Sequence, residues 1–179
     1  MHIFPYILGY LLLGLVWAVT DPTGRPGFKD RSKTTALLMT IMAFQLASAL
    51  FFPWPATSVD GLATGLGRIL FWGGFLLAVW AKLQMKHNWG VPAQHAIARQ
   101  KTLVTAGPFR YTRNPIYVGL IFMALGASLA IRSVLFPFVF LFIIHIRRIV
   151  SIEEPLLTKH FGKAYDEYKR RVPRFLLFF

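Results

Sequence analysis

The sequence contains no cysteine, and only seven of its 179 residues are acidic, whereas 20 are lysine or arginine. Without cysteine the chain has no disulfide, no thiolate nucleophile and no cysteine-ligated metal site. Its five histidines show no metal-binding spacing such as two histidines four residues apart, so we expect no metal site. Neither of the two common glycine-rich phosphate-binding patterns is present, which leaves a soluble nucleotide-binding fold without support.

What the chain has in quantity is apolar surface: 55% of its residues are hydrophobic, and its mean hydropathy is +0.52. A soluble domain of this length buries only part of its surface, so it rarely carries so many apolar residues. The first apolar run lacks a basic flank and a small-residue cleavage motif, so we do not interpret it as a signal peptide. The net charge of +13 is better explained by basic loops facing anionic lipid than by nucleic acid.

Five apolar runs predict an all-α, polytopic integral membrane protein with about five transmembrane helices. Three of them approach the roughly 20 residues that a helix needs to cross the hydrocarbon core. They cover residues 3–19, 35–52 and 62–81. The last two, residues 116–131 and 133–146, are shorter and are joined through Arg132, which predicts a C-terminal helical hairpin. Whether this hairpin crosses the whole bilayer stays open at this point.

Prolines divide the C-terminal half further. Pro137 is a candidate kink in the second arm of the hairpin, and Pro155 is expected to stand in the first turn of the next helix. That helix, residues 156–171, has an apolar and a charged face and is predicted to lie in the membrane interface. We therefore divide the chain into three N-terminal transmembrane helices, residues 1–81, and a C-terminal half, residues 82–179, which form one integrated domain.

The distribution of lysine and arginine predicts the orientation. Residues 21–33 carry four of them, residues 82–113 carry six, and the chain from Arg147 onward carries eight. The opposite side has only Arg68 and Arg132. By the positive-inside rule, the N-terminus lies outside and the C-terminus in the cytosol. The compact size and the lack of cysteine favour a prokaryotic inner membrane.

The most distinctive segment joins the basic region to the first arm of the hairpin. Arg110 and Arg113 precede Pro115, which suits the first position of a helix, and Asn114 is a favourable N-cap. With Tyr117 they are expected to cluster where a membrane helix leaves the aqueous side, which is a suitable place for an anionic ligand. A simpler interpretation is also open, in which the arginines contact lipid phosphate and the tyrosine belongs to the interface belt.

Among the acidic residues, only Glu153 and Glu154 directly follow an apolar run. On a continuous helix Arg147, Ser151 and Glu154 share one face, because they are four and three residues apart. These charges are candidates for chemistry because polar groups at membrane depth are costly unless they are satisfied. The alternative is an interfacial ion pair that contributes little to stability.

Two segments resemble the signature of the isoprenylcysteine carboxyl methyltransferase family and its phospholipid methyltransferase relatives. Residues 102–119 read TLVTAGPFRYTRNPIYVG, similar to the pattern T-L-V-x-x-G-x-[YF]-x-x-x-R-[HN]-P-x-Y-x-G. Residues 153–173 read EEPLLTKHFGKAYDEYKRRVP, similar to E-E-x-x-L-x-x-x-[FY]-G-x-x-Y-x-x-Y-x-x-x-V-P. The resemblance covers about residues 84–175, and the first two apolar runs carry none of it.

The resemblance implies S-adenosylmethionine bound on the cytosolic side and a lipidic substrate that enters from the bilayer. Many family members have histidine where this chain has Asn114, so any role that needs an imidazole proton is lost here. With Arg110 from the same segment, the cofactor-binding candidates are Gln94, Gly107, Pro108, Arg110, Arg113, Asn114, Tyr117 and Glu154. The catalytic candidates are Arg147, Glu153 and Glu154. Gln94 matches a family glutamine, but its surroundings differ.

The chemistry leaves two acceptors open. Methyl transfer from a sulfonium is an in-line displacement, in which the protein positions two reactants and excludes water. A carboxylate acceptor needs an arginine to orient it, whereas an amine acceptor needs a base, and the chain offers both. The tail block resembles the prenylcysteine branch and favours O-methylation of a lipidic carboxylate. The alternatives are a phospholipid headgroup N-methyltransferase, a sterol-reductase-like enzyme using NADPH, and a non-enzymatic membrane scaffold.

Overall fold

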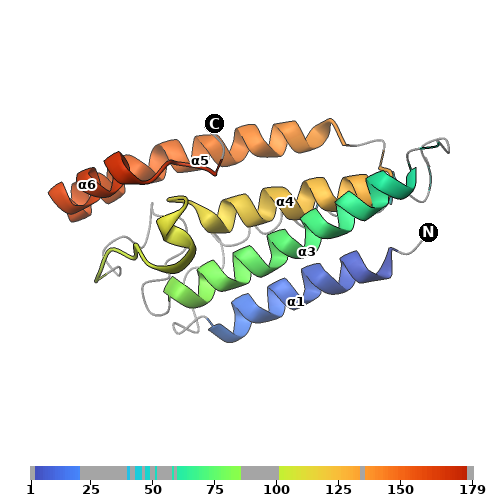
Figure 1. Ribbon diagram of the computed structural model, residues 1–179, viewed down its shortest axis with the longest axis horizontal. Coiled ribbons are helices and arrows are strands. Elements are labelled where there is room, and N and C mark those ends of the chain that lie inside the picture. Colours follow the sequence, from blue (N-terminus) through green and yellow to red (C-terminus); the bar gives the residue numbers. More distant parts are fainter. Residues whose placement is uncertain are drawn as a thin grey trace.

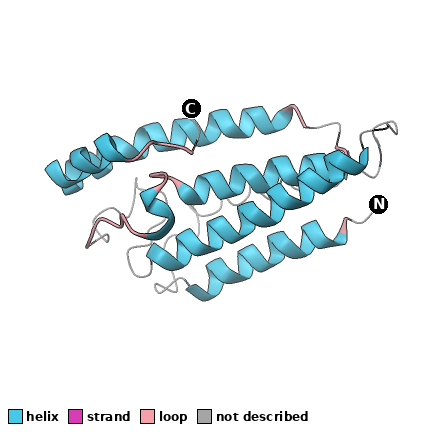
Figure 2. Ribbon diagram, viewed as in Figure 1, coloured by secondary structure: helices cyan, strands magenta, loops and turns pink. Residues whose placement is uncertain are grey.

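The computed structural model describes residues 3–20, 40, 43–45, 47–48, 51, 58, 60–85, 101–133 and 136–176. Within these ranges the regular structure is helical, as the sequence predicts (Figure 2). The elements are α1 (Phe4–Thr20), α3 (Asp60–Met85), the 3-10 helix η3 (Gly107–Arg110), α4 (Pro115–Ala130), α5 (Phe138–Phe161) and α6 (Lys163–Arg171). Gln94 and the predicted loop at residues 21–33 lie outside the described residues.

The centre of the fold is the antiparallel pair of α3 and α4 (Figure 1). Their contact is a seam of glycines, Gly67 and Gly74 on α3 and Gly119 and Gly126 on α4, each pair seven residues apart. A Cβ atom added to Gly74 would lie 2.5 Å from the carbonyl oxygen of Gly119. One added to Gly67 would lie 2.6 Å from the backbone nitrogen of Ala130. The two backbones therefore touch, which only residues without a side chain permit.

Helix α1 packs against the other side of α3. The rings of Tyr6 and Tyr10 meet the fully buried ring of Phe71 edge-on, with centroids 5.0 Å and 5.2 Å apart. The outward faces of both helices remain apolar, since Leu11 is 62% exposed and Ile69 is 70% exposed. Exposed apolar faces of this kind are what a helix in lipid presents.

Helix α3, with 26 residues, is the one described helix that is long and apolar enough by itself to cross a membrane. Helices α1 and α4 are apolar but shorter, at 17 and 16 residues. Of the second apolar run, residues 35–52, only isolated positions are described. Two of them bind α4 and the turn that follows it: Gln45 donates to Ser128 Oγ at 2.7 Å, and Ser48 shares a hydrogen bond of 2.7 Å with Ser133.

The hairpin differs from the sequence prediction in where its second arm begins and ends. Pro137 is the residue before α5 and does not kink it, because its fixed φ suits a helix start. Helix α5 then continues through Pro155 to Phe161, so the prediction that Pro155 begins a new helix was wrong. Pro155 is tolerated because it lies on an exposed face, where water can satisfy the carbonyl that loses its partner. The break comes at Gly162, whose φ is +55°.

Candidate active site

The candidate site lies at the end of the bundle where α4 begins and α5 ends. Pro115 occupies the first turn of α4, as predicted, and Asn114 stands at the N-cap position. The side chain of Asn114 makes no capping hydrogen bond and instead donates to the carbonyl oxygen of Arg174 at 3.1 Å. The expected cap was therefore wrong in its side-chain contact, because a neighbouring carbonyl captures the amide.

Arg113, just before this helix, forms the centre of the cluster. Its Nε and Nη2 atoms donate to Glu154 Oε1 at 2.9 Å and 2.7 Å. Its Nη1 atom donates to the carbonyl oxygens of Val172 at 2.6 Å and Lys169 at 3.3 Å. Both side chains are largely buried, with 10% of Arg113 and 7% of Glu154 exposed. Such a buried, multiply bonded pair holds α4 and α5 at one spacing.

Glu154 binds a second arginine on its other oxygen. Arg174 donates to Glu154 Oε2 from Nε at 3.1 Å and from Nη2 at 2.5 Å. We name residues 172–176, which follow α6, the C-terminal strap. The backbone N–H of Arg113 donates to the carbonyl of Pro173 in the strap at 2.9 Å, and Thr112 Oγ1 donates to that of Arg174 at 2.9 Å. One carboxylate thus joins the start of α4, the end of α5 and the strap.

The neighbouring carboxylate, Glu153, is paired with Tyr117 of α4. The phenol of Tyr117 donates to Glu153 Oε1 at 3.0 Å, and Glu153 is 9% exposed. On α5 the two glutamates continue a buried stripe formed by Val139, Phe142, Ile146 and Val150. The stripe is apolar where it faces α4 and becomes acidic only at the end of the bundle.

Two tyrosines of α6 lie over this cluster. Burial raises the pKa of the Tyr165 phenol well above its usual range; the Glu154 carboxylate raises it further, and Arg113 lowers it. Burial also raises the pKa of Tyr168, whose hydroxyl donates to the carbonyl of Phe109 at 2.7 Å. Both phenols therefore stay protonated at ordinary pH, and Tyr168 ties α6 to η3 as a neutral group.

A family model described as phospholipid methyltransferase matches residues 62–164 of this chain. The chain belongs to the phospholipid methyltransferase family. The matched segment contains α3, α4 and α5 and includes Arg113, Tyr117, Glu153 and Glu154. It ends before the strap, so Arg174 lies beyond it. The resemblance that the sequence motifs indicate is confirmed.

Relatives of known name agree with this assignment. The protein-S-isoprenylcysteine O-methyltransferase of Saccharomyces cerevisiae is 26% identical over 71% of this chain and 56% of its own length. That of Mus musculus is 29% identical over 81% of this chain and 51% of its own length. The cobalt-zinc-cadmium resistance protein CzcN of Cupriavidus metallidurans is 32% identical over 75% of this chain and 59% of its own length. The chain spans about half the length of the curated relatives it matches.

The predicted site residues of this family member fall into two groups. The structure brings Arg113, Asn114, Tyr117, Glu153 and Glu154 into one contact network. Arg174 completes it and was missed by the sequence prediction, although its place directly after the motif ending in Val172-Pro173 gave a signal that it lies near the site.

The remaining candidates lie around this network. Gly107 is the first residue of η3 and has a φ of +61°. Pro108, the next residue, is buried. Arg110 at the end of η3 and Arg147 on α5 are exposed, and neither forms an ion pair with a described residue. Arg147 lies seven residues before Glu154, which is about 10 Å along a helix. Gln94 stays a prediction outside the described residues.

Proposed function

We propose that this chain is an S-adenosylmethionine-dependent methyltransferase that acts on a membrane-embedded lipidic acceptor, with a carboxylate as the methylated group. The observation that carries the proposal is the Arg113–Glu154 and Tyr117–Glu153 network at one end of the family-matched helices. Two of the relatives are named as O-methyltransferases of isoprenylcysteine, which supports the carboxylate acceptor.

The residues present fit the proposed cofactor. S-adenosylmethionine has a carboxylate, an ammonium group and ribose hydroxyls, which call for guanidinium, carboxylate and amide partners. The Oδ1 atom of Asn114 accepts no hydrogen bond from a described residue, so it can accept one from a ligand. Arg110 and Arg147 are exposed and suit a carboxylate, whereas Glu153 suits an ammonium or hydroxyl group. When bound, the cofactor supplies an electrophilic methyl group.

The roles of the chain's own residues follow from their surroundings. Arg113 and Glu154 neutralise each other, so we assign them to positioning the start of α4 and the strap around the cofactor. Arg147 orients the acceptor carboxylate, which needs no base because it is already ionised. Burial of the network under α6 excludes water, which helps to position the two reactants.

A second acceptor class is favoured by one observation. Glu153 is largely buried and accepts a hydrogen bond from Tyr117, so a base stands at the site if the acceptor is an amine. The matched family is named for phospholipid methylation, which is consistent with a headgroup nitrogen. N-methylation of a phospholipid headgroup is therefore the alternative function.

We further propose that the chain crosses the membrane about five times, with the N-terminus outside and the C-terminus in the cytosol. Helix α3 supports one crossing by its length and composition. The exposed charged residues of α6 and the basic end of the chain support a cytosolic site. On this topology the site opens to the cytosol of a prokaryotic cell, and the acceptor comes from the bilayer.

The test is a pair of calorimetric titrations of the purified full chain in detergent. We expect S-adenosylhomocysteine to bind and NADPH not to bind, because the cluster offers groups for an amino acid and lacks a phosphate-binding motif. Binding of NADPH alone would favour a sterol-reductase-like enzyme. Binding of neither ligand by folded protein would favour a scaffold and would end the proposal. Methyl transfer to a prenylated carboxylate or to a phospholipid amine then identifies the acceptor.

A further inference from the structure

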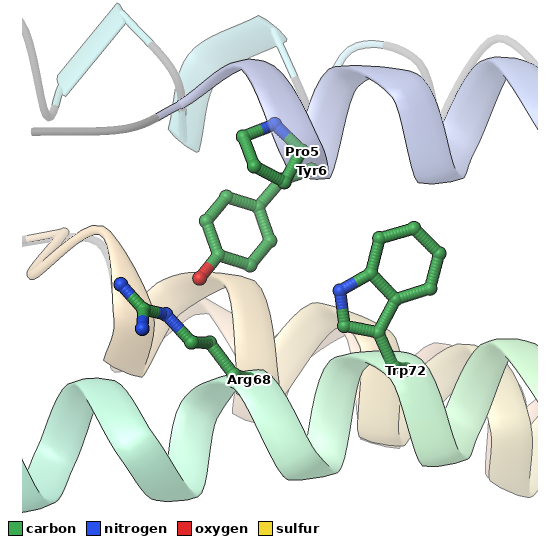
Figure 3. A pocket seen from close by; sticks show the side chains of 4 residues that line it. All are labelled: Pro5, Tyr6, Arg68 and Trp72. Carbon is green, nitrogen blue, oxygen red and sulfur yellow. The ribbon is translucent and has the colours of Figure 1, made fainter.

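A cavity lies at the opposite end of the bundle from the Arg113–Glu154 cluster. It has a volume of about 280 Å³ and is lined by Pro5 and Tyr6 of α1 and by Arg68 and Trp72 of α3 (Figure 3). Its position near the start of α1 and in the first half of α3 places it far from the start of α4 (Figure 1). The family motifs of the sequence do not include these residues.

The hydroxyl of Tyr6 lies at the edge of this cavity. Tyr6 is only 3% exposed, and its ring is fixed edge-on against Phe71. Its hydroxyl points toward the guanidinium of Arg68 and finds no hydrogen-bond partner among the described residues. The hydroxyl oxygen is not one of the fully enclosed polar atoms of the described residues, so a ligand at the edge of the cavity can reach it.

Two more donors from α3 lie at the edge of this cavity. The guanidinium of Arg68 lies beside the Tyr6 hydroxyl, and the indole nitrogen of Trp72 faces the cavity (Figure 3). Trp72 is held in place by an edge contact with Phe71 at 5.3 Å. Arg68 forms no ion pair with a described residue. The surface of the cavity itself is almost entirely apolar, so it suits an apolar group, whereas the donors at its edge, one of them positively charged, suit an anionic oxygen.

The surroundings indicate where this anion comes from. The outer faces beside the cavity are apolar: Phe4 is 72% exposed, Leu66 is 49% exposed and Ile69 is 70% exposed. Arg68 lies eight residues after the start of α3, about 12 Å along the helix. An arginine among lipid-facing residues at that depth is costly unless it reaches a headgroup. A phospholipid provides both an anionic phosphodiester for Arg68 and acyl chains for the apolar surroundings. Free phosphate provides only the anionic group.

We propose that Pro5, Tyr6, Arg68 and Trp72 form a binding site for one phospholipid at the end of the bundle away from the methyltransferase site. Arg68 and the Tyr6 hydroxyl hold the phosphodiester, and the indole N–H of Trp72 donates to an ester or phosphate oxygen. Pro5 and the ring of Trp72 form the wall for the glycerol and the first acyl carbons. The lipid joins α1 to α3 and takes no part in methyl transfer.

Native mass spectrometry of the delipidated full chain tests this site, with dioctanoyl phosphatidylglycerol and dioctanoyl phosphatidylcholine as probes. We expect one lipid to bind tightly from either source, because both carry a phosphodiester. Arg68→Gln should weaken the first binding step at least about tenfold, as expected for a lost charged hydrogen bond. Tyr6→Phe should weaken it by about three- to tenfold, since it removes one hydroxyl and keeps the ring on Phe71. Arg148→Gln, at an exposed arginine of α5, is the control for a lost charge and should change nothing.

Two further ligands separate the sources of the anion. Dioctanoylglycerol, which lacks phosphate, should fail to displace the bound phospholipid, and so should inorganic phosphate, which lacks acyl chains. The proposal is overturned if Arg68→Gln and Arg148→Gln lose the same affinity, or if dioctanoylglycerol competes as well as the phospholipids. S-adenosylhomocysteine binding, measured on the same variants, should be unchanged and shows that they are folded.

Discussion

Glu154 is bound on each of its two carboxylate oxygens by a different arginine. A buried carboxylate is costly unless its charge and its lone pairs are satisfied, and here Arg113 and Arg174 satisfy both. The two arginines are not equivalent, since the side chain of Arg113 is 10% exposed and that of Arg174 is 39% exposed. Removal of Arg113 should therefore cost much more stability than removal of Arg174.

We predict that Arg113→Ala lowers the free energy of unfolding by about 3 kcal/mol, because it leaves a buried carboxylate with one partly exposed partner. It should also weaken S-adenosylhomocysteine binding, because the start of α4 and the strap lose the pair that positions them around the cofactor. Thermal unfolding in detergent and calorimetry measure the two effects. Arg110→Ala serves as the stability control because Arg110 is exposed, and it should stay within about 0.5 kcal/mol of the parent. Unchanged ligand affinity in Arg113→Ala would remove this residue from the cofactor site.

Substitutions of Arg147 and of the two glutamates should have different effects for a carboxylate acceptor and for an amine acceptor. If the acceptor is a carboxylate, Arg147→Lys should lose activity although it keeps its charge, because the planar fork is lost. Glu153→Gln and Glu154→Gln should then act mainly through cofactor affinity and keep most of their turnover at saturating cofactor. If the acceptor is an amine, a glutamine variant should lose turnover at neutral pH and recover part of it as the pH rises and the amine deprotonates unaided. Recovery at high pH in a rate profile would overturn the carboxylate proposal.

At the scale of elements, the seam of Gly67, Gly74, Gly119 and Gly126 decides how closely α3 and α4 approach. The sequence shows these glycines, and their spacing is not the four-residue pattern usually associated with helix contact. The seven-residue spacing is that of a left-handed helix pair, which keeps the same face toward the partner over several turns. The sequence could therefore suggest a close contact, whereas the partner helix needed the structure.

Two adjacent glycines offer a direct test of the seam. We predict that Gly74→Ala lowers the free energy of unfolding by about 1–3 kcal/mol, because the new methyl group meets backbone atoms that cannot move without separating the helices. Gly73→Ala should be neutral or stabilising by up to about 1 kcal/mol, since nothing lies within 4 Å of its added Cβ and alanine favours a helix. Chemical or thermal unfolding in the same detergent measures both. Equal effects at the two positions would show that α3 and α4 do not touch at Gly74.

The whole molecule can be tested for its topology without removing any native cysteine, because the chain contains none. We predict that single cysteines at Thr23, Gln100 and Lys169 react with a membrane-impermeant reagent only from the cytosolic side. A cysteine at Thr57 should react only from the outside. The physical reason is the distribution of lysine and arginine, which keeps residues 21–33, 82–113 and 152–179 on one side. Labelling of Gln100 and Thr57 from the same side would exclude five crossings.

Much of the fold was predictable because apolar runs in a membrane protein are long and uniform. The described helices α1, α3 and α4 each fall within a few residues of a predicted run. The sequence also singled out Arg113, Tyr117 and the two glutamates as site candidates, and the structure places each arginine or tyrosine in contact with one glutamate. The prediction failed for Pro155, because a proline on a wet helix face costs less than its usual effect on a buried helix.

The rest of the site depended on long-range contacts that no local pattern encodes. The side chain of Asn114 stands where it could cap the first turn of α4. Its amide nitrogen instead donates to the carbonyl oxygen of Arg174 in the strap. Arg174 is 20 residues from Glu154 along the chain and reaches it only because Gly162 turns α6 back. Contacts of this kind follow from tertiary packing, so the sequence alone could not give the partners of the strap.

The glycine seam also limits how this sequence can vary. Any substitution at Gly67, Gly74, Gly119 or Gly126 adds atoms, because every other amino acid is larger than glycine. No replacement of equal or smaller size is therefore open to these positions. A comprehensive substitution screen scored for folded protein should therefore show four positions that accept almost nothing. Gly14, Gly61, Gly65 and Gly73, which have open space around an added Cβ, should accept many residues. On α3, glycines that accept substitution and glycines that do not would thus lie only a few residues apart.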